Sequence, residues 1–124
     1  MAMRRADTIA FDRPGGESCP GPTKRPIDLA HLSRQTMGDR ALEQEVLTLF
    51  LQQAAAFAEK LDRADPIEAG RLIHTLKGSA RGVGAFAIAD CMSNMEINPQ
   101  DRRLRQRLGT LIAEARNFIA AINR

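Results

Sequence analysis

Apolar residues recur at spacings of three and four along most of this chain, and that periodicity limits its fold more than any other feature. It runs through four segments, which cover about residues 40–64, 66–81, 86–97 and 104–122. The apolar positions of the first segment are Leu42, Val46, Leu49, Phe50, Phe57 and Leu61, with Leu47 and Leu51 beside them. Those of the third are Phe86, Ile88, Ala89, Met92, Met95 and Ile97, and those of the last are Leu104, Leu108, Leu111, Ala115, Phe118 and Ile122. An α-helix turns once in about 3.6 residues, so this spacing places the apolar side chains of each segment on one helical face.

Residues that favour helix ends separate these segments. Asp28 is placed to cap a short first helix, and Asp39 to cap a longer one. Asp65-Pro66 puts a cap residue before a proline, and Asn98-Pro99 repeats that pattern before the last helix. The apolar residues of the short first helix are Leu29, Leu32 and Met37. Because short connections join antiparallel neighbours, we predict an all-α, up-and-down four-helix bundle with a short extra N-terminal helix.

Length and composition indicate one domain that follows a polar tail. The tail contains Pro14-Gly15-Gly16, Pro20-Gly21-Pro22 and Pro26 among scattered charges, with too few apolar groups to offset the entropy lost on ordering. A chain of 124 residues is long enough for one hydrophobic core. We therefore predict a flexible N-terminal tail over residues 1–26 and a single domain over residues 27–124.

The charge of the chain does not call for a nucleic-acid partner. Its net charge is +3, and residues 27–124 hold thirteen basic and twelve acidic side chains. The one run of like charge is at residues 102–107. The chain contains no Trp or Tyr, which proteins that bind single strands use to stack on bases. We expect a solvated helical face there and no binding to nucleic acid.

Several features favour a cytoplasmic location. No apolar run approaches the roughly 18 residues that a membrane span needs, and no apolar stretch follows Arg4 and Arg5 as it would in a signal peptide. Cys19 lies in the tail and Cys91 in an apolar helical segment, which argues against a disulfide framework. We expect Cys91 to be a buried apolar group, and the neighbouring methionines, Met92 and Met95, to fill the core.

The segment at residues 66–81 carries a histidine in the middle of its polar face. Projected as a helix, that face collects Gly70, Arg71, His74, Lys77, Gly78 and Arg81. The opposite face collects Ala69, Leu72, Ile73, Leu76, Ala80 and Val83. A glycine inside a helix lowers its stability by roughly 1 kcal/mol relative to alanine. The presence of Gly78, one turn after His74, therefore suggests a role other than helix formation. We expect it to leave clearance beside the ring, whereas Gly82 and Gly84 are suited to end the helix near Arg81.

The chemistry available at His74 is that of an exposed nucleophile. A neutral imidazole has a free lone pair, and a phosphoryl group on it would bring two negative charges that Lys77 could stabilise. A hydrolase would need an orienting carboxylate and a second nucleophile. Neither lies close to His74 in sequence, although a residue distant in sequence can be near in space. This pattern favours a phosphohistidine carrier over a hydrolase.

The residues His74-Thr75-Leu76-Lys77-Gly78-Ser79, with Val83-Gly84-Ala85, resemble the motif of histidine phosphotransfer (HPt) domains. Met95-Glu96 also resembles the segment that follows this motif, where Leu-Glu is commoner. The resemblance covers the chain from about Ile27 to its C-terminus and implies a four-helix bundle that relays phosphoryl groups in two-component signalling. It implies that His74 is phosphorylated, that Lys77 lies near the phosphoryl group, and that Gly78 and Gly84 are the small positions of the motif.

The resemblance also implies the partners. His74 would exchange its phosphoryl group with an aspartate of a response-regulator receiver domain, alone or within a hybrid sensor histidine kinase. The receiver would supply the Mg²⁺, so we expect no cofactor on this chain, and the absence of an ATP-binding motif implies a phosphotransfer protein rather than an enzyme of the kinase class. We expect a monomer. From the helical projection, the receiver would dock around Arg71, Thr75, Gly78, Arg81 and Gly82.

Three other interpretations remain open at this stage. One is a helical adaptor that binds receivers or kinases without transferring phosphate, although the intact motif argues against it. Another is a metal-binding bundle, but the positions of Cys19, His31, His74 and Cys91 show no ligand spacing, so we predict no metal site. The last is a basic helical domain that binds DNA.

Overall fold

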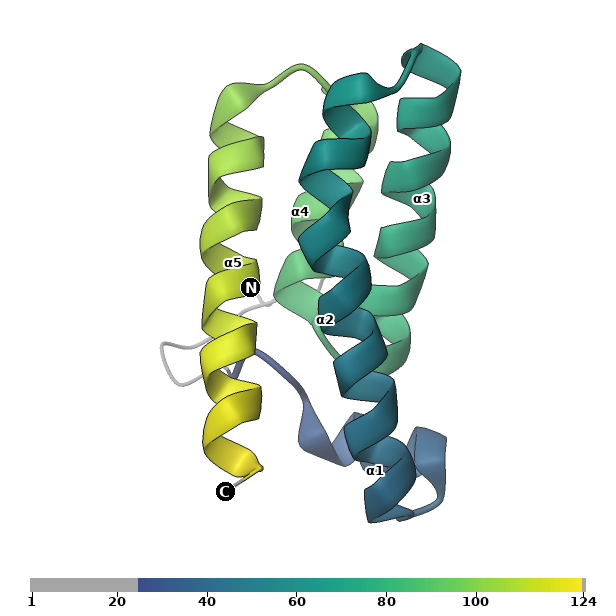
Figure 1. Ribbon diagram of the computed structural model, residues 1–124, viewed down its shortest axis with the longest axis vertical. Coiled ribbons are helices and arrows are strands. Elements are labelled where there is room, and N and C mark those ends of the chain that lie inside the picture. The colour runs from purple at the N-terminus through teal and green to yellow at the C-terminus, as the bar shows by residue number, and fades with distance from the viewer. Residues whose placement is uncertain (1–24, 124) are drawn as a thin grey trace, which may run out of the picture.

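Helices alone make up the secondary structure of the computed structural model over residues 25–123, the part of the chain that the structure describes (Figure 1). They are α1 (Leu29–Thr36), α2 (Arg40–Arg63), α3 (Pro66–Val83), α4 (Phe86–Ile97) and α5 (Arg102–Ile122). Apart from Arg25 and Pro26, the predicted flexible tail lies outside the described residues, and both it and the boundary at residue 27 stay predictions.

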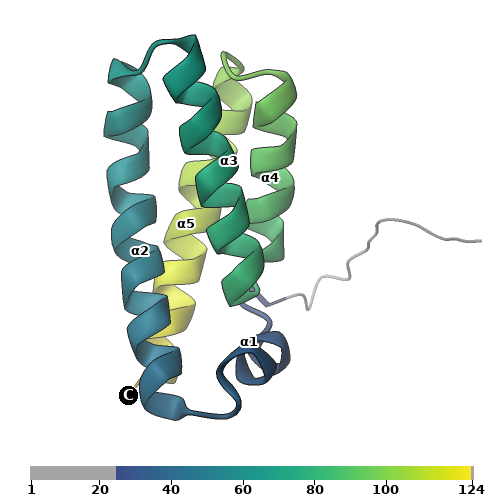
Figure 2. The same cartoon turned by 90° about the vertical axis from the view of Figure 1, so that its right-hand side faces the viewer.

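The four longer helices run alternately up and down, and α1 lies across the lower end of the bundle (Figures 1 and 2). Figure 2 shows α3 between α2 and α4, which are the two helices it contacts most. The predicted all-α bundle with a short extra N-terminal helix is therefore confirmed. None of the helices within residues 25–123 combines the length and the apolar character that crossing a membrane requires.

Aspartate side chains begin four of the helices. The carboxylates of Asp28, Asp39 and Asp65 accept hydrogen bonds from His31 N, Leu42 N and Glu68 N at 2.8 to 3.0 Å. Each bond satisfies an amide that the helix itself leaves without an acceptor.

The predicted start of the last helix was wrong by three residues. Asp101, not Asn98, caps α5, and its Oδ1 accepts from Arg103 N at 2.8 Å. Asn98 instead ends α4, and its carbonyl accepts from Asp101 N at 3.1 Å to close a turn over Pro99. An aspartate also places a negative charge at the positive end of the helix dipole, which Asn98 could not do.

Gly84 alone ends α3, which runs two residues beyond the predicted end at Arg81. Its φ of +86° lies in the left-handed region that favours glycine, whereas Gly82 is an ordinary helical residue. A Cβ at Gly84 would lie 2.8 Å from the carbonyl oxygen of Asp28, and the Gly84 carbonyl accepts from Asp28 N at 2.9 Å. Gly84 therefore also holds the start of α1 against the α3–α4 turn.

The core forms where the apolar side of α3 meets the other helices. Ile73, Leu76 and Ala80 of α3 are almost fully buried together with Met92 and Met95 of α4. The expectation that these two methionines fill the core is confirmed. Burial of an Ile, Leu or Met side chain stabilises a fold by about 1.5–3 kcal/mol relative to exposure.

Some predicted core positions turned out to be exposed. On α2 the buried residues are Leu47, Phe50, Ala54, Phe57 and Leu61. This stripe passes through Ala54, which lies between the predicted positions Phe50 and Phe57, so Leu42 and Leu49 fall on its exposed flank. Met37 and Ile97 are exposed as well, because each lies at the end of its helix and beyond the packed face.

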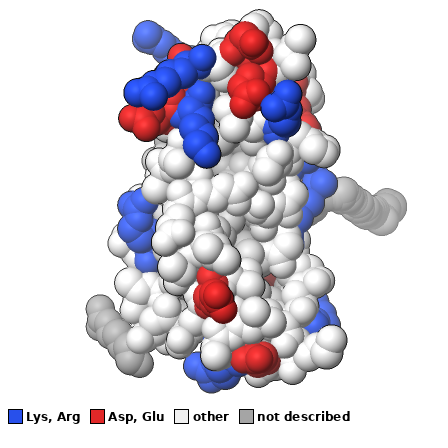
Figure 3. Space-filling view, turned by 45° about the vertical axis from the view of Figure 1, so that its right-hand side comes forward, with Lys and Arg blue, Asp and Glu red and all other residues white. Residues whose placement is uncertain are grey.

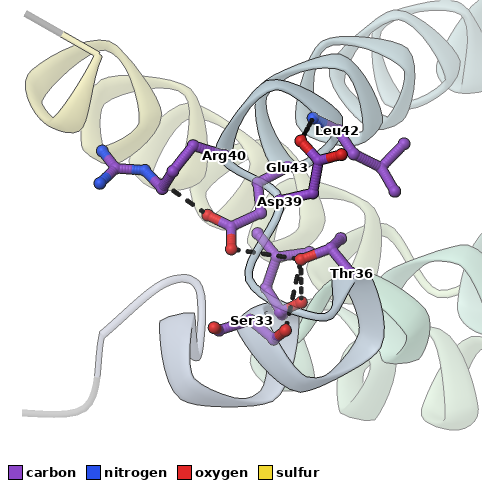
Figure 4. Close-up of polar contacts among 7 residues, drawn as sticks. Ser33, Thr36, Asp39, Arg40, Leu42 and Glu43 are labelled. Carbon is purple, nitrogen blue, oxygen red and sulfur yellow. Dashed lines mark hydrogen bonds and ion pairs between the residues drawn. The ribbon is translucent and has the colours of Figure 1, made fainter.

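A polar junction joins α1 to α2 (Figure 4). Thr36 is buried, and its Oγ1 lies 3.0 Å from the carbonyl oxygen of Leu32 and 3.2 Å from Glu43 Oε2. Glu43 also lies 3.9 Å from Arg40 Nε. The hydroxyl of Thr36 thus has partners despite its burial, which a polar group in a protein interior requires.

Candidate functional site

His74 lies on the outer face of α3, and 75% of its side chain is exposed. Its Nδ1 lies 3.2 Å from Oε2 of Glu96, a residue of α4. The two residues are 22 positions apart in sequence, and the packing of α4 against α3 brings their side chains together.

Glu96 also binds Lys77. The ammonium of Lys77 donates to Glu96 Oε1 at 2.5 Å, so one carboxylate joins the histidine to the lysine. Only 14% of the Lys77 side chain is exposed. The helical projection places Lys77 on the polar face with His74, and the side chain turns from there toward α4 to meet a carboxylate that the projection did not include.

Sequence reasoning missed Glu96 as a site residue. No residue near His74 in sequence could supply the carboxylate, and Glu96 was noted only because Met95-Glu96 resembled the segment after the motif. Its position depends on the register between α3 and α4, which local patterns do not encode. Once antiparallel neighbours are assumed, an acidic residue beside the buried Met95 is the available signal.

The carboxylate determines which nitrogen of His74 is free. The Lys77 hydrogen bond, and after it the His74 hydrogen bond, lowers the pKa of the Glu96 carboxyl below its ordinary value. An ionised carboxylate can only accept hydrogen bonds, so the ring proton belongs on Nδ1, which donates to it. The lone pair of the ring is then on Nε2, the nitrogen that Glu96 does not touch.

The predicted docking residues share the solvent side of α3 with His74. Arg71 pairs with Glu68 at 3.0 Å, and Arg81 lies 3.5 Å from Ser93 Oγ, so both guanidinium groups have partners within the chain. Thr75 is exposed. Gly78 and Gly82 are exposed too, and an added Cβ at either would meet nothing within 4 Å. The role of these five residues in docking stays a prediction.

Comparison with known proteins identifies the family of this fold and site. A family model for the Hpt domain matches residues 45–121, more than half of the chain. The chain belongs to the Hpt domain family. The resemblance inferred from the motif at His74 is thereby confirmed, and Hpt domains are phosphotransfer intermediates.

A solved structure agrees with this assignment. The Hpt domain described here is similar to the histidine phosphotransferase ShpA from Caulobacter crescentus, with 36% identity and a TM-score of 0.64. The similarity covers 79% of this chain and 90% of that chain. No curated protein matches the sequence. Members of the Hpt family act with receiver domains and kinases in phosphorelays, which is the class of function supported for this chain.

A largely uncharged surface lies over α2 and α3 of this Hpt domain. Figure 3 shows charged side chains toward the ends of the face over α2 and α3, with a broad uncharged middle. A hollow of about 350 Å³ lies there between the two helices. It is lined by Val46, Leu49, Phe50, Gln53, Ser79, Gly82 and Val83. Leu49, which the sequence pattern had placed in the core, is therefore an exposed residue that lines this hollow.

Other candidate residues of the Hpt domain lie away from His74. The ring of His31 packs edge-on against Phe86, with centroids 5.1 Å apart. Cys91 is buried as expected, and burial raises the pKa of its thiol although the charge of Arg107 opposes this. Residues 25–123 contain no group of three or more His, Cys, Asp or Glu side chains that could hold a metal ion.

Proposed function

We propose that this Hpt domain is a phosphorelay intermediate in which His74 accepts a phosphoryl group from a receiver aspartate and donates it to another. The observation that supports this most is the contact between His74 Nδ1 and Glu96 on an exposed face of α3. It leaves Nε2 as a free nucleophile that a second protein can reach. Membership in the Hpt family supports the reaction class.

In the forward step, the Nε2 lone pair of His74 attacks the phosphorus of an aspartyl phosphate. The N–P bond forms while the bond from phosphorus to the aspartate oxygen breaks, and its electron pair returns to the aspartate as a carboxylate. The ring keeps its proton on Nδ1 and gains positive charge as it bonds to phosphorus. Glu96 accepts a hydrogen bond from that nitrogen, so its negative charge stabilises the developing cation. The reverse step restores neutral His74.

Lys77 has two tasks in this proposal. Before transfer it holds Glu96 in place through a hydrogen bond to Oε1. After transfer, the phosphoryl group adds about two negative charges one helical turn away, and an ammonium with three donors can bind both anions. Lys77 then stabilises phosphohistidine without releasing the carboxylate that orients the ring.

The remaining requirements fall on the partner. We place Mg²⁺ in the acidic pocket of the receiver, where it would offset the charge of the phosphoryl group, and none on this chain. The partner is a response-regulator receiver domain or the receiver of a hybrid sensor kinase. We expect the Hpt domain to act as a cytoplasmic monomer, with a receiver covering Arg71, Thr75, Gly78, Arg81 and Gly82 during transfer.

A transfer assay tests this proposal. Receiver domains from the same genome are phosphorylated with acetyl phosphate, freed of the donor and mixed with the full chain and Mg²⁺. We expect acid-labile, base-stable phosphate on the wild-type chain and none on His74→Gln. Phosphate that persists on His74→Gln, or that no receiver delivers, contradicts the proposal. Receiver binding without transfer would instead support a non-transferring adaptor.

A further inference from the structure

Two large apolar side chains near the reactive histidine are almost fully exposed. Ile67 of α3 is 80% exposed and Ile97 of α4 is 79% exposed. Single exposed apolar residues are common on protein surfaces and need no explanation. These two differ because both lie toward one end of the bundle and both are placed close to His74.

Helix geometry relates Ile67 to the reactive ring. Ile67 precedes His74 by seven residues on the same helix. Seven residues complete two helical turns to within about 20°. Ile67 therefore projects from the same face, about 10 Å along the axis. Arg81 follows His74 at the same interval, so one strip of α3 carries an apolar, a reactive and a basic side chain in order.

Ile97 flanks the ring from the neighbouring helix. It directly follows Glu96, whose carboxylate contacts His74 Nδ1 at 3.2 Å. Met95, on the other side of Glu96, is fully buried, so the helix directs Ile97 away from the core. The two isoleucines thus border the His74 site on α3 and α4.

A partner whose interface has the ordinary size and is centred on His74 would cover these side chains. A standard interface buries about 800 Å² on each partner, which corresponds to a disc of about 16 Å radius. A disc of that size centred on His74 includes Ile67 and Ile97. A second copy of this chain that covered the face permanently would block His74, so the proposed reaction favours a transient partner that carries the acceptor aspartate.

We propose that Ile67 and Ile97 are apolar anchors for the receiver domain, and this inference rests on the proposed function. The receiver that fits presents apolar side chains on the side of its aspartate that meets Ile67 and an acidic or polar side chain toward Arg81. Apolar contacts at the interface strengthen binding, whereas the chemistry remains with His74, Lys77 and Glu96. Ile67 and Ile97 therefore determine affinity for the receiver and not the rate of the bound complex.

The test compares Ile67→Ser/Ile97→Ser with wild type and with Met37→Ser. Met37 is 94% exposed at the α1–α2 turn, at the other end of the bundle, and is the matched control. The probe is the phosphorylated receiver that phosphorylates wild type fastest, and initial rates are measured over a range of receiver concentrations. We expect the double variant to show about a tenfold lower kcat/KM, mainly through KM, and Met37→Ser to match wild type.

Further measurements separate docking from chemistry and from association. Phosphoramidate, a small donor that needs no docking surface, should still phosphorylate His74 in the double variant. The inference would be overturned if the double variant kept the wild-type kcat/KM, or if Met37→Ser lost as much. It would also be overturned if the double variant no longer reacted with phosphoramidate, or if the wild type were a dimer that the double substitution dissociates. If no receiver phosphorylates the wild type, the proposed function fails and the inference fails with it. If transfer is normal and insensitive to the substitutions, only the inference fails.

Discussion

His74 Nδ1 lies 3.2 Å from Glu96 Oε2, although 22 residues separate these side chains along the chain. Through Oε1 the same carboxylate also binds Lys77. Glu96 therefore orients the ring, assigns its proton to Nδ1 and leaves Nε2 free, while Lys77 keeps the carboxylate in place. The proposed reactivity of His74 depends on this three-residue arrangement and not on the histidine alone.

Replacement of Glu96 with glutamine should slow phosphoryl transfer without unfolding the bundle. The amide keeps the shape of the side chain but removes the negative charge, and it can present NH₂ to the ring, so Nδ1 is no longer held as the donor. We expect on the order of a tenfold to hundredfold lower transfer rate at saturating receiver, since small losses of orientation have effects of that size. Rapid-quench kinetics measure it, and a wild-type rate would contradict the assigned role.

The stability of the bundle should depend on the charge of Glu96 in acid. The pKa of this carboxyl is lowered by its hydrogen bond to Lys77 and then by that to His74. A carboxyl whose folded pKa is lowered stabilises the fold above its unfolded pKa, and the contribution disappears as pH falls through the folded value. At about pH 7, Glu96→Gln should therefore have a lower Tm than wild type, and the gap should close below the ordinary glutamate range of about 4. Circular dichroism melts across this range test it, and a constant gap would contradict the linkage.

Gly78 offers a test of clearance beside the ring. An added Cβ there meets nothing within 4 Å, so Gly78→Ala should raise the free energy of unfolding by up to about 1 kcal/mol, the helix cost of glycine. Gly78→Phe should block transfer with only a modest loss of stability, because its bulk occupies the space that the receiver needs. Gly109→Phe is the matched control, since Gly109 also has nothing within 4 Å and lies on α5. A wild-type rate of transfer in Gly78→Phe would show that the receiver does not need the space beside Gly78.

Gly84 should behave in the opposite way to Gly82. Gly84 has φ of +86°, and its Cβ would lie 2.8 Å from the carbonyl oxygen of Asp28. Gly84→Ala should lower the free energy of unfolding by about 2–3 kcal/mol, which combines backbone strain with displacement of the segment before α1. Gly82→Ala should be neutral or stabilising, because its Cβ meets nothing within 4 Å. Urea titrations of both variants test this contrast, and equal effects would contradict it.

Local signals accounted for most of the fold. Asp28, Asp39 and Asp65 act within three residues of their own position, so the helix starts they mark could be predicted from sequence. The start of α5 could not, because Asn98 and Asp101 are both good caps and the choice between them depends on the α4–α5 turn. The exposure of Leu49 could not be predicted either, because the apolar stripe of α2 is wider than the part of the helix that packs against its neighbours.

The site was predictable in part for a similar reason. Helix geometry places Lys77 and Gly78 beside His74, because they follow it by three and four residues on one helix. Glu96 reaches them only through the register of α3 against α4, which is a tertiary property. The contact between Lys77 and Glu96 could not be predicted for that reason, since the carboxylate is on another helix.

Nuclear magnetic resonance of the phosphorylated chain tests most directly whether Nε2 of His74 carries the phosphoryl group. With ¹⁵N-labelled histidine, the couplings to phosphorus and the ring shifts identify the phosphorylated nitrogen. We predict a single phosphohistidine at His74 with phosphorus on Nε2 and a proton on Nδ1, the nitrogen that lies against Glu96. Phosphorus on Nδ1 of His74, or on another residue, would contradict it.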